Sequence, residues 1–154
     1  MWRPERQPPQ GLATGVISRE SETQPVAQVL VADDDEGIRE SLRMLLEDEG
    51  HSVIEACNGR ETLAILHGDN VRRIVLLDLV MPDMDGLKLL ESLRDDTALG
   101  SRHAYIVLSA GSETMMSQAQ PLVTALAGAI VRKPFDIEEV TRAVNAAAQR
   151  LAAD

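Results

Sequence analysis

The chain has 154 residues, the length of one domain, and 44% of them are hydrophobic, so it can bury a sizeable core. Its 15 Lys and Arg stand against 25 Asp and Glu, and the net charge of -10 argues against nucleic acid or an anionic membrane surface as a partner. A single cysteine, Cys57, excludes an internal disulfide, and the lack of a signal-like or membrane-spanning apolar stretch leads us to expect a cytoplasmic protein.

The beginning of the chain differs in composition from the rest. The first 25 residues contain four of the seven prolines and few apolar side chains, a composition typical of a flexible segment. We therefore expect a flexible tail over residues 1–26 and one folded domain over residues 27–154. No output domain is expected after it.

From residue 28 onwards, strand and helix patterns alternate. Short apolar runs predict five buried strands, over residues 28–32, 52–56, 74–77, 105–108 and 129–131. Apolar residues at helical spacing predict helices over residues 38–49, 63–67, 87–93 and 136–151. A further helix is possible between the fourth and fifth strands, but Pro121 is expected to break or kink it.

Alternating strands and helices of this kind predict an α/β fold. We expect a five-stranded parallel sheet, doubly wound, with helices on both faces. In such sheets the ligand site lies beyond the carboxyl ends of the strands, so the residues that follow each strand are the candidates for function.

Chemically active side chains follow four of the predicted strands. They are Asp33, Asp34 and Asp35 after the first, Asp78 after the third, Ser109 after the fourth and Lys133 after the fifth. Clustered carboxylates repel one another unless a cation lies among them, and ligands that are all oxygen favour Mg²⁺. Beside such an ion Asp78 can act as a nucleophile and form an aspartyl phosphate. The Ser109 hydroxyl and the Lys133 ammonium are suited to bind the phosphoryl oxygens.

Four motifs in this order resemble those of bacterial two-component response-regulator receiver domains. They are Val-Leu-Val-Ala-Asp-Asp-Asp at 29–35, Val-Leu-Leu-Asp-Leu-Val-Met-Pro-Asp-Met-Asp-Gly at 75–86, Val-Leu-Ser-Ala at 107–110 and Val-Arg-Lys-Pro-Phe at 131–135. The resemblance spans roughly residues 28–152. It implies a doubly wound (βα)5, flavodoxin-like receiver fold.

The resemblance also implies a role for each site residue. Asp78 is the implied phosphoacceptor, and Ser109 and Lys133 hold the phosphoryl group. The implied Mg²⁺ ligands are Asp34, Asp33 (mostly through water), Asp78 and the backbone carbonyl of Val80. The peptide bond between Lys133 and Pro134 is expected to be cis.

The implied function is that of a signalling module. Such a receiver accepts a phosphoryl group from a histidine kinase or a histidine phosphotransfer protein onto Asp78 in a Mg²⁺-dependent reaction. It then signals through protein–protein contacts to a downstream target, which the sequence does not identify. It catalyses only its own phosphotransfer and dephosphorylation and is not otherwise an enzyme. The nearest analogy is with the stand-alone receivers of chemotaxis and sporulation.

Two departures from the receiver pattern leave an alternative open. Receivers often carry Tyr or Phe three residues before the lysine, where this chain has Ile130, and the loop at 126–129 is about two residues shorter than usual. A pseudo-receiver, which binds partners but is not phosphorylated, would tolerate both. A Mg²⁺-dependent phosphohydrolase fits less well, because Gly37 stands where its Asp-x-Asp motif requires Thr or Val. The three histidines, His51, His67 and His103, share no metal spacing and are expected to be ordinary surface or loop residues.

Overall fold

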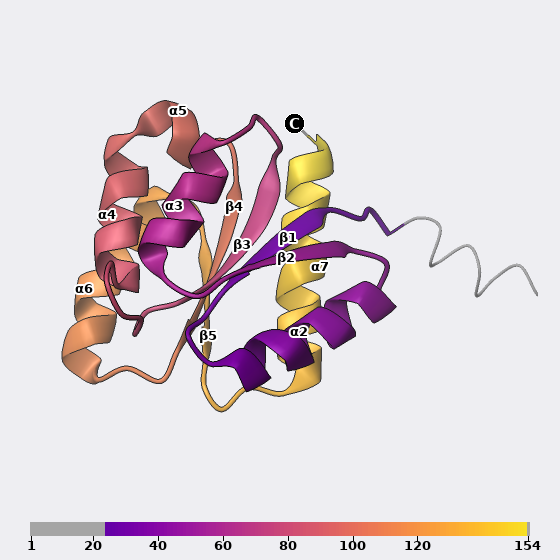
Figure 1. Ribbon diagram of the computed structural model, residues 1–154, viewed down its shortest axis with the longest axis horizontal. Coiled ribbons are helices and arrows are strands. Elements are labelled where there is room, and N and C mark those ends of the chain that lie inside the picture. Colours follow the sequence, from indigo (N-terminus) through magenta and orange to yellow (C-terminus); the bar gives the residue numbers. More distant parts are fainter. Residues whose placement is uncertain (1–23, 154) are drawn as a thin grey trace, which may run out of the picture.

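The structure is a computed structural model that describes residues 24–153. The predicted flexible tail, residues 1–26, therefore lies almost entirely outside the described residues. The described chain forms a parallel sheet between two layers of helices (Figure 1). None of the helices in this range is long and apolar enough to cross a membrane.

The sheet has the five parallel strands that the apolar runs predict. They are β1 (Gln28–Ala32), β2 (Ser52–Ala56), β3 (Arg73–Asp78), β4 (Ala104–Ser109) and β5 (Ala129–Arg132), in the order β2-β1-β3-β4-β5. All residues of β3 and β4 are buried, as expected for strands covered on both faces. The prediction of a doubly wound parallel sheet is confirmed.

Six helices in the described range cover the two faces. They are α2 (Glu36–Asp48), α3 (Gly59–His67), α4 (Gly86–Asp95), α5 (Thr97–Gly100), α6 (Glu113–Ala125) and α7 (Ile137–Ala153). Side chains alternate along each strand, so the core divides into two clusters. Leu30, Val75 and Val107 pack with α3, α4 and α6 on one face. Val31, Leu76 and Ile106 pack with α2 and α7 on the other, the side on which Figure 1 shows those two helices.

Helices begin at the edge of the sheet where the strands end, and polar side chains cap them there. The Asp35 carboxylate accepts the N–H of Ile38 at the start of α2, and Asp85 accepts that of Lys88 at the start of α4. At the start of α7, Asp136 and Glu139 accept each other's backbone N–H, at 2.8 and 3.2 Å, and so form a capping box.

The prediction of a break at Pro121 is wrong, since α6 runs unbroken from Glu113 to Ala125. Proline lacks the N–H that would bond to the carbonyl of Ser117, four residues earlier. Both residues are exposed, so water can solvate that carbonyl. On the opposite side of the helix, Ala119 and Val123 are fully buried against the sheet and hold α6 in place.

Two of the three histidines are buried, although they lie in loops. His51 and His103 lie in loops as expected, but each is only 5% exposed. The Nδ1 atom of His51 accepts the backbone N–H of Ala27 at 3.1 Å, and Nδ1 of His103 accepts that of Arg73 at 3.0 Å. Each ring thus satisfies a backbone donor where a strand enters the sheet.

Candidate functional site

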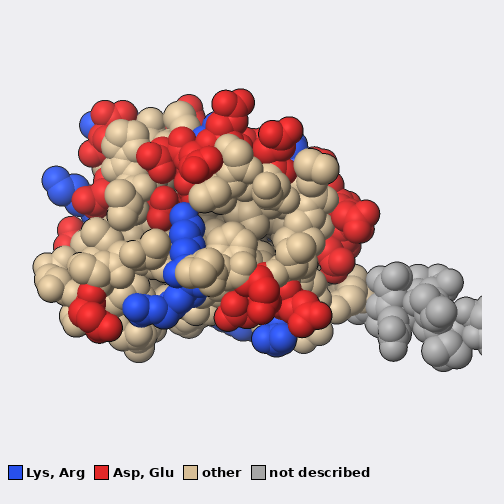
Figure 2. Space-filling model, turned by 90° about the horizontal axis from the view of Figure 1, so that it is seen from below, with Lys and Arg blue, Asp and Glu red and all other residues tan. Residues whose placement is uncertain are grey.

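The register of the sheet brings the predicted site residues to one edge. Ala32 pairs with Leu77 across β1 and β3, and Ser109 pairs with Arg132 across β4 and β5. Asp33, Asp78 and Lys133 directly follow Ala32, Leu77 and Arg132. They therefore emerge, together with Ser109, at the same end of neighbouring strands. Figure 2 looks onto this end, where acidic side chains lie on both sides of a short basic band.

Three carboxylates form a cluster there. Asp33, Asp34 and Asp78 each offer an oxygen atom, and these atoms all lie within 4.8 Å of one another. Asp33 is 1% exposed and Asp78 is 6% exposed, whereas Asp34 is open to solvent. The donor set contains only oxygen and has one open side, which suits a hard divalent cation that retains water ligands.

Lys133 is the cation that the structure places beside this cluster. Its Nζ lies 3.2 Å from Oδ2 of Asp33 and 3.6 Å from Oδ1 of Asp78. The Lys133 backbone N–H donates to the carbonyl of Ser109 at 2.8 Å, and the following bond to Pro134 is cis, as predicted. The ammonium group is therefore held between two strands that end in carboxylates.

The charges at the site do not balance. Burial raises the pKa of the Asp78 carboxyl above its ordinary value, and the Asp33 carboxylate raises it further. The Lys133 ammonium and the backbone N–H of Val80, which is 3.4 Å from Oδ1, lower the same pKa without reversing the shift. One ammonium faces three carboxylates, so an added divalent cation would relieve the repulsion.

Ser109 and Val80 lie at the same end of the sheet as the carboxylate cluster. The Ser109 side chain is buried, and its hydroxyl oxygen accepts the N–H of Gly111 at 2.9 Å, so its own hydrogen is available to a phosphoryl oxygen. Val80 directs its backbone N–H toward Asp78 and leaves its side chain 55% exposed. Its backbone thus lies beside the carboxylate cluster.

Two features that support the site were not predicted. Arg39 on α2 donates from Nη1 to the Asp33 carbonyl at 2.7 Å and from Nε to Glu55 at 2.8 Å, which ties the end of β1 to β2. A lone arginine on an amphipathic helix carries no signal that would mark this role. Gly86 is the second feature, because a Cβ atom there would lie 2.5 Å from Cα of Leu79 and 2.7 Å from the carbonyl oxygen of Asp78.

Comparisons with known proteins agree with this geometry. A family model described as a response regulator receiver domain matches residues 29–145. The chain is 35% identical over 127 residues to response regulator MprA of Mycolicibacterium vanbaalenii, which covers 82% of this chain and 52% of the relative. It is 32% identical over 118 residues to sporulation initiation phosphotransferase F of Bacillus subtilis, which covers 77% of this chain and 90% of the relative.

A solved structure shares the architecture. Response regulator protein TrrA from Thermotoga maritima, in complex with Mg²⁺ and BeF, matches with a TM-score of 0.64 at 29% identity. The match covers 78% of this chain and 97% of that one. The chain spans about half the length of MprA but most of the length of the other two relatives.

Proposed function

The chain belongs to the response regulator receiver domain family and has the phosphoacceptor role of that family, and on this premise we propose that Asp78 is the residue that is phosphorylated. One observation supports this assignment above the others. The Asp78 carboxylate ends the central strand, beside the Lys133 ammonium and the Asp33 carboxylate, where it is nearly buried but can be reached from the open side of the cluster.

The donor set at this site fits Mg²⁺. Asp33, Asp34 and Asp78 would hold the ion, with the carbonyl oxygen of Val80 as a further ligand. When bound, Mg²⁺ supplies positive charge that neutralises the carboxylates and the incoming phosphoryl oxygens. The repulsion that raises the pKa of Asp78 is the property of the chain that such an ion would relieve.

The transfer itself is a nucleophilic substitution at phosphorus. An oxygen of the Asp78 carboxylate bonds to the phosphorus of a phosphohistidine, and the P–N bond breaks with its electron pair staying on the imidazole. Lys133 pairs with the phosphoryl oxygens from one side and the Ser109 hydroxyl donates from the next strand. The chain acts as a phosphoacceptor and not as an enzyme with a separate substrate. We further propose that the chain catalyses its own dephosphorylation and that it acts in the cytoplasm.

The phosphodonor is proposed to be a histidine kinase or a histidine phosphotransfer protein, and its docking surface adjoins the site. A groove of about 550 Å³ runs between α2 and the start of α7. Its apolar wall includes Ile38, Leu42, Phe135 and the 63%-exposed Ile137, and its edge is Asp35, the neighbour of the site residue Asp34. For the histidine of a phosphodonor to reach Asp78, the donor surface around that histidine must lie over the edge of the groove at Asp35. We therefore propose that the part of the donor surrounding its histidine occupies this groove.

Substitution of Asp78 tests the phosphoacceptor. Asp78→Asn preserves the shape of the side chain and removes the nucleophile, so acetyl phosphate should leave no hydroxylamine-sensitive label on this variant. Asp83→Asn is the matched control, because Asp83 is an exposed acid in the next loop and asparagine tolerates its positive φ of 65°. Label retained on Asp78→Asn would overturn the assignment. A folded wild-type chain that takes no label would favour the pseudo-receiver instead.

A second substitution tests the docking groove. Ile137→Ser should slow transfer from a phosphohistidine protein by about tenfold, because it removes an exposed apolar contact. Labelling by acetyl phosphate, which needs no docking, should not change. Met44→Ser removes an equally exposed apolar side chain of α2 that does not line the groove, and should leave both rates unaltered. An equal loss of transfer rate from the phosphohistidine protein in Ile137→Ser and Met44→Ser would contradict the assignment of the groove to docking.

A further inference from the structure

Asp34 is the one carboxylate of the site that has no partner of its own. Lys133 pairs with Asp33 and with Asp78. Within residues 24–153, by contrast, no hydrogen bond or ion pair holds the exposed side chain of Asp34. Its oxygen nevertheless lies within 4.8 Å of an oxygen of each of the other two carboxylates, where like charges repel one another. A side chain held against repulsion without a partner takes its direction from the backbone.

The peptide units on both sides of Asp34 are fixed. The Asp33 carbonyl, in the preceding unit, accepts a hydrogen bond from Nη1 of Arg39 at 2.7 Å. The Asp35 N–H, in the following unit, donates to Oδ1 of Asp33 at 2.9 Å. Because each peptide unit is planar, two fixed units also fix the direction of the Cα–Cβ bond between them. The direction of the Asp34 side chain therefore depends on these two hydrogen bonds.

Arg39 is itself anchored in two directions. It stands in the first turn of α2, where its backbone N–H donates to the Asp35 carbonyl at 3.0 Å. Its Nε donates to Glu55 at 2.8 Å, and only 15% of its side chain is exposed. The planar guanidinium thus holds the carboxylate of Glu55 and the carbonyl of Asp33 at a fixed angle to each other.

Arg43 offers a comparison on the same helix. It lies one turn after Arg39 and also donates to Glu55, from Nε at 2.6 Å. Its other hydrogen bonds go to α2 and β2 and not to Asp33. The two arginines therefore share one acid and carry the same charge, and they differ in the contact with the Asp33 carbonyl.

We propose that Arg39 is a positioning residue for the divalent cation, because its bond to the Asp33 carbonyl fixes the backbone that directs Asp34 to the ion. The inference rests on the proposed function, in which Asp34 is a Mg²⁺ ligand. The geometric effect of Arg39 opposes that of its charge. A guanidinium near the site repels Mg²⁺, so its removal would tighten binding if charge alone mattered. Loss of the bond to Asp33 weakens binding instead, because Asp34 then takes directions that do not reach the ion.

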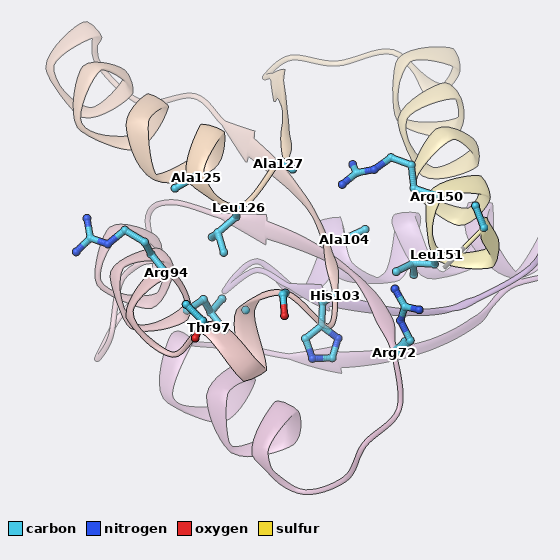
Figure 3. A pocket seen from close by; sticks show the side chains of 14 residues that line it. Arg72, Arg94, Thr97, His103, Ala104, Ala125, Leu126, Ala127, Arg150 and Leu151 are labelled. Carbon is cyan, nitrogen blue, oxygen red and sulfur yellow. The ribbon is translucent and has the colours of Figure 1, made fainter.

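A Mg²⁺ titration of the full chain, followed by NMR amide shifts, measures the affinity without phosphorylation. Arg39→Gln should weaken Mg²⁺ binding about tenfold, as loss of a group that orients a metal ligand does. Arg43→Gln loses the same charge and the same acid and should bind as the wild type does. Arg150→Gln removes an exposed charge beside the cavity of Figure 3, at the opposite end of the sheet, and should also leave the affinity unchanged.

A second measurement reports the position directly. In the metal-free protein, the backbone order parameters of Asp34 and Asp35 should fall in Arg39→Gln and stay unchanged in Arg43→Gln. Arg39→Lys retains the charge beside Glu55 but lacks the planar fork, so it should also weaken Mg²⁺ binding, and it serves if Arg39→Gln does not fold.

Three results would overturn the proposal. They are equal affinities in Arg39→Gln and Arg43→Gln, tighter binding by Arg39→Gln, and wild-type affinity in Arg39→Lys. A folded wild-type chain that binds no Mg²⁺ would overturn the proposed metal site, and this role with it.

Discussion

Asp78 is a carboxylate whose surroundings favour its protonated form. Its pKa is raised, first by burial and then by Asp33, so at neutral pH its ionisation opposes folding of the metal-free chain. The folded state holds this proton more tightly than the unfolded state. Its contribution to stability is therefore present at low pH and is lost as pH rises through the folded pKa.

Asp78→Asn should accordingly raise the melting temperature of the metal-free protein at pH near 7, because it removes the buried charge. Thermal melting in the presence of a chelator measures the effect. Asp83→Asn should leave the melting temperature unchanged, since that residue is exposed. A lower melting temperature for Asp78→Asn would show that the three carboxylates are not under the repulsion described above.

The buried histidines titrate in the opposite sense. Burial lowers the pKa of His51, and lowers that of His103 from 6.5 to about 4. Between these two values the unfolded chain binds a proton that folded His103 does not, so stability falls as the pH drops through this window. The predicted loss from His103 is on the order of 3 kcal/mol.

His103→Asn isolates that contribution. Asparagine can still accept the N–H of Arg73 but does not titrate, so the fall in unfolding free energy between pH 6.5 and 4 should be smaller in this variant. Urea unfolding at several pH values provides the measurement. If the unfolding free energy fell equally with pH in His103→Asn and in the wild type, His103 would be protonated in the folded state over this pH range.

At the scale of elements, the loop from β3 to α4 requires a glycine at position 86, because there is no space for a side chain there. A Cβ atom at Gly86 would overlap the backbone of Leu79 and the carbonyl oxygen of Asp78. The Gly86 N–H also donates to the Leu79 carbonyl at 2.9 Å. The first turn of α4 is thereby packed directly on the loop that follows Asp78.

Gly86→Ala should therefore lower stability by about 2 kcal/mol and also slow acetyl phosphate labelling of the protein that remains folded. Gly37→Ala is the control. Gly37 also lies in the first turn of a helix near the site, but a Cβ there would meet only the Asp35 side chain, at 3.3 Å. If the two variants were equally stable and equally active, the close packing at Gly86 would be of no consequence.

The sequence allowed most elements to be predicted, because apolar runs and helical spacing report burial directly. It failed at α6, where tertiary packing of Ala119 and Val123 outweighs the local effect of Pro121. The four-residue α5 is too short to show a period. The edge at which Asp33, Asp78 and Lys133 meet followed from the strand ends. The support from Arg39 and Gly86, and the burial of His103, depend on contacts between distant segments that no local pattern encodes.

At the scale of the whole molecule, a bound ion should couple the strands that carry its ligands. A ligand that binds only the folded state adds RT ln(1 + [Mg²⁺]/Kd), or about 1.4 kcal/mol at ten times Kd. Asp34→Ala should abolish this Mg²⁺-dependent rise in melting temperature, and Asp83→Asn should retain it. A full rise in the Asp34 variant would contradict the ligand set.

Phosphorylation should move one side of the molecule more than the other. Ile130 stands where many receivers have an aromatic ring, and its half-buried, β-branched side chain packs into the cluster that includes α6. We expect the response to lie in the backbone between Ser109 and Ile130, with little change in α2. NMR shifts with and without beryllofluoride measure this. Shifts confined to the neighbours of Asp78 would mean that partners read the phosphate alone.

The ion pair between Lys133 and Asp33 joins residues 100 positions apart, and each pair of neighbouring strands in the sheet is parallel. No hairpin can nucleate such a sheet, so assembly waits for long-range crossovers. During synthesis Asp33 and Asp78 leave the ribosome well before the lysine that partly neutralises them. A nascent chain therefore carries its acidic triad uncompensated, and competence to receive a phosphoryl group arrives only when β5 closes the edge. Truncated chains that end before residue 129 should consequently accept no phosphoryl group, because they lack β5 and Lys133 and cannot complete the site.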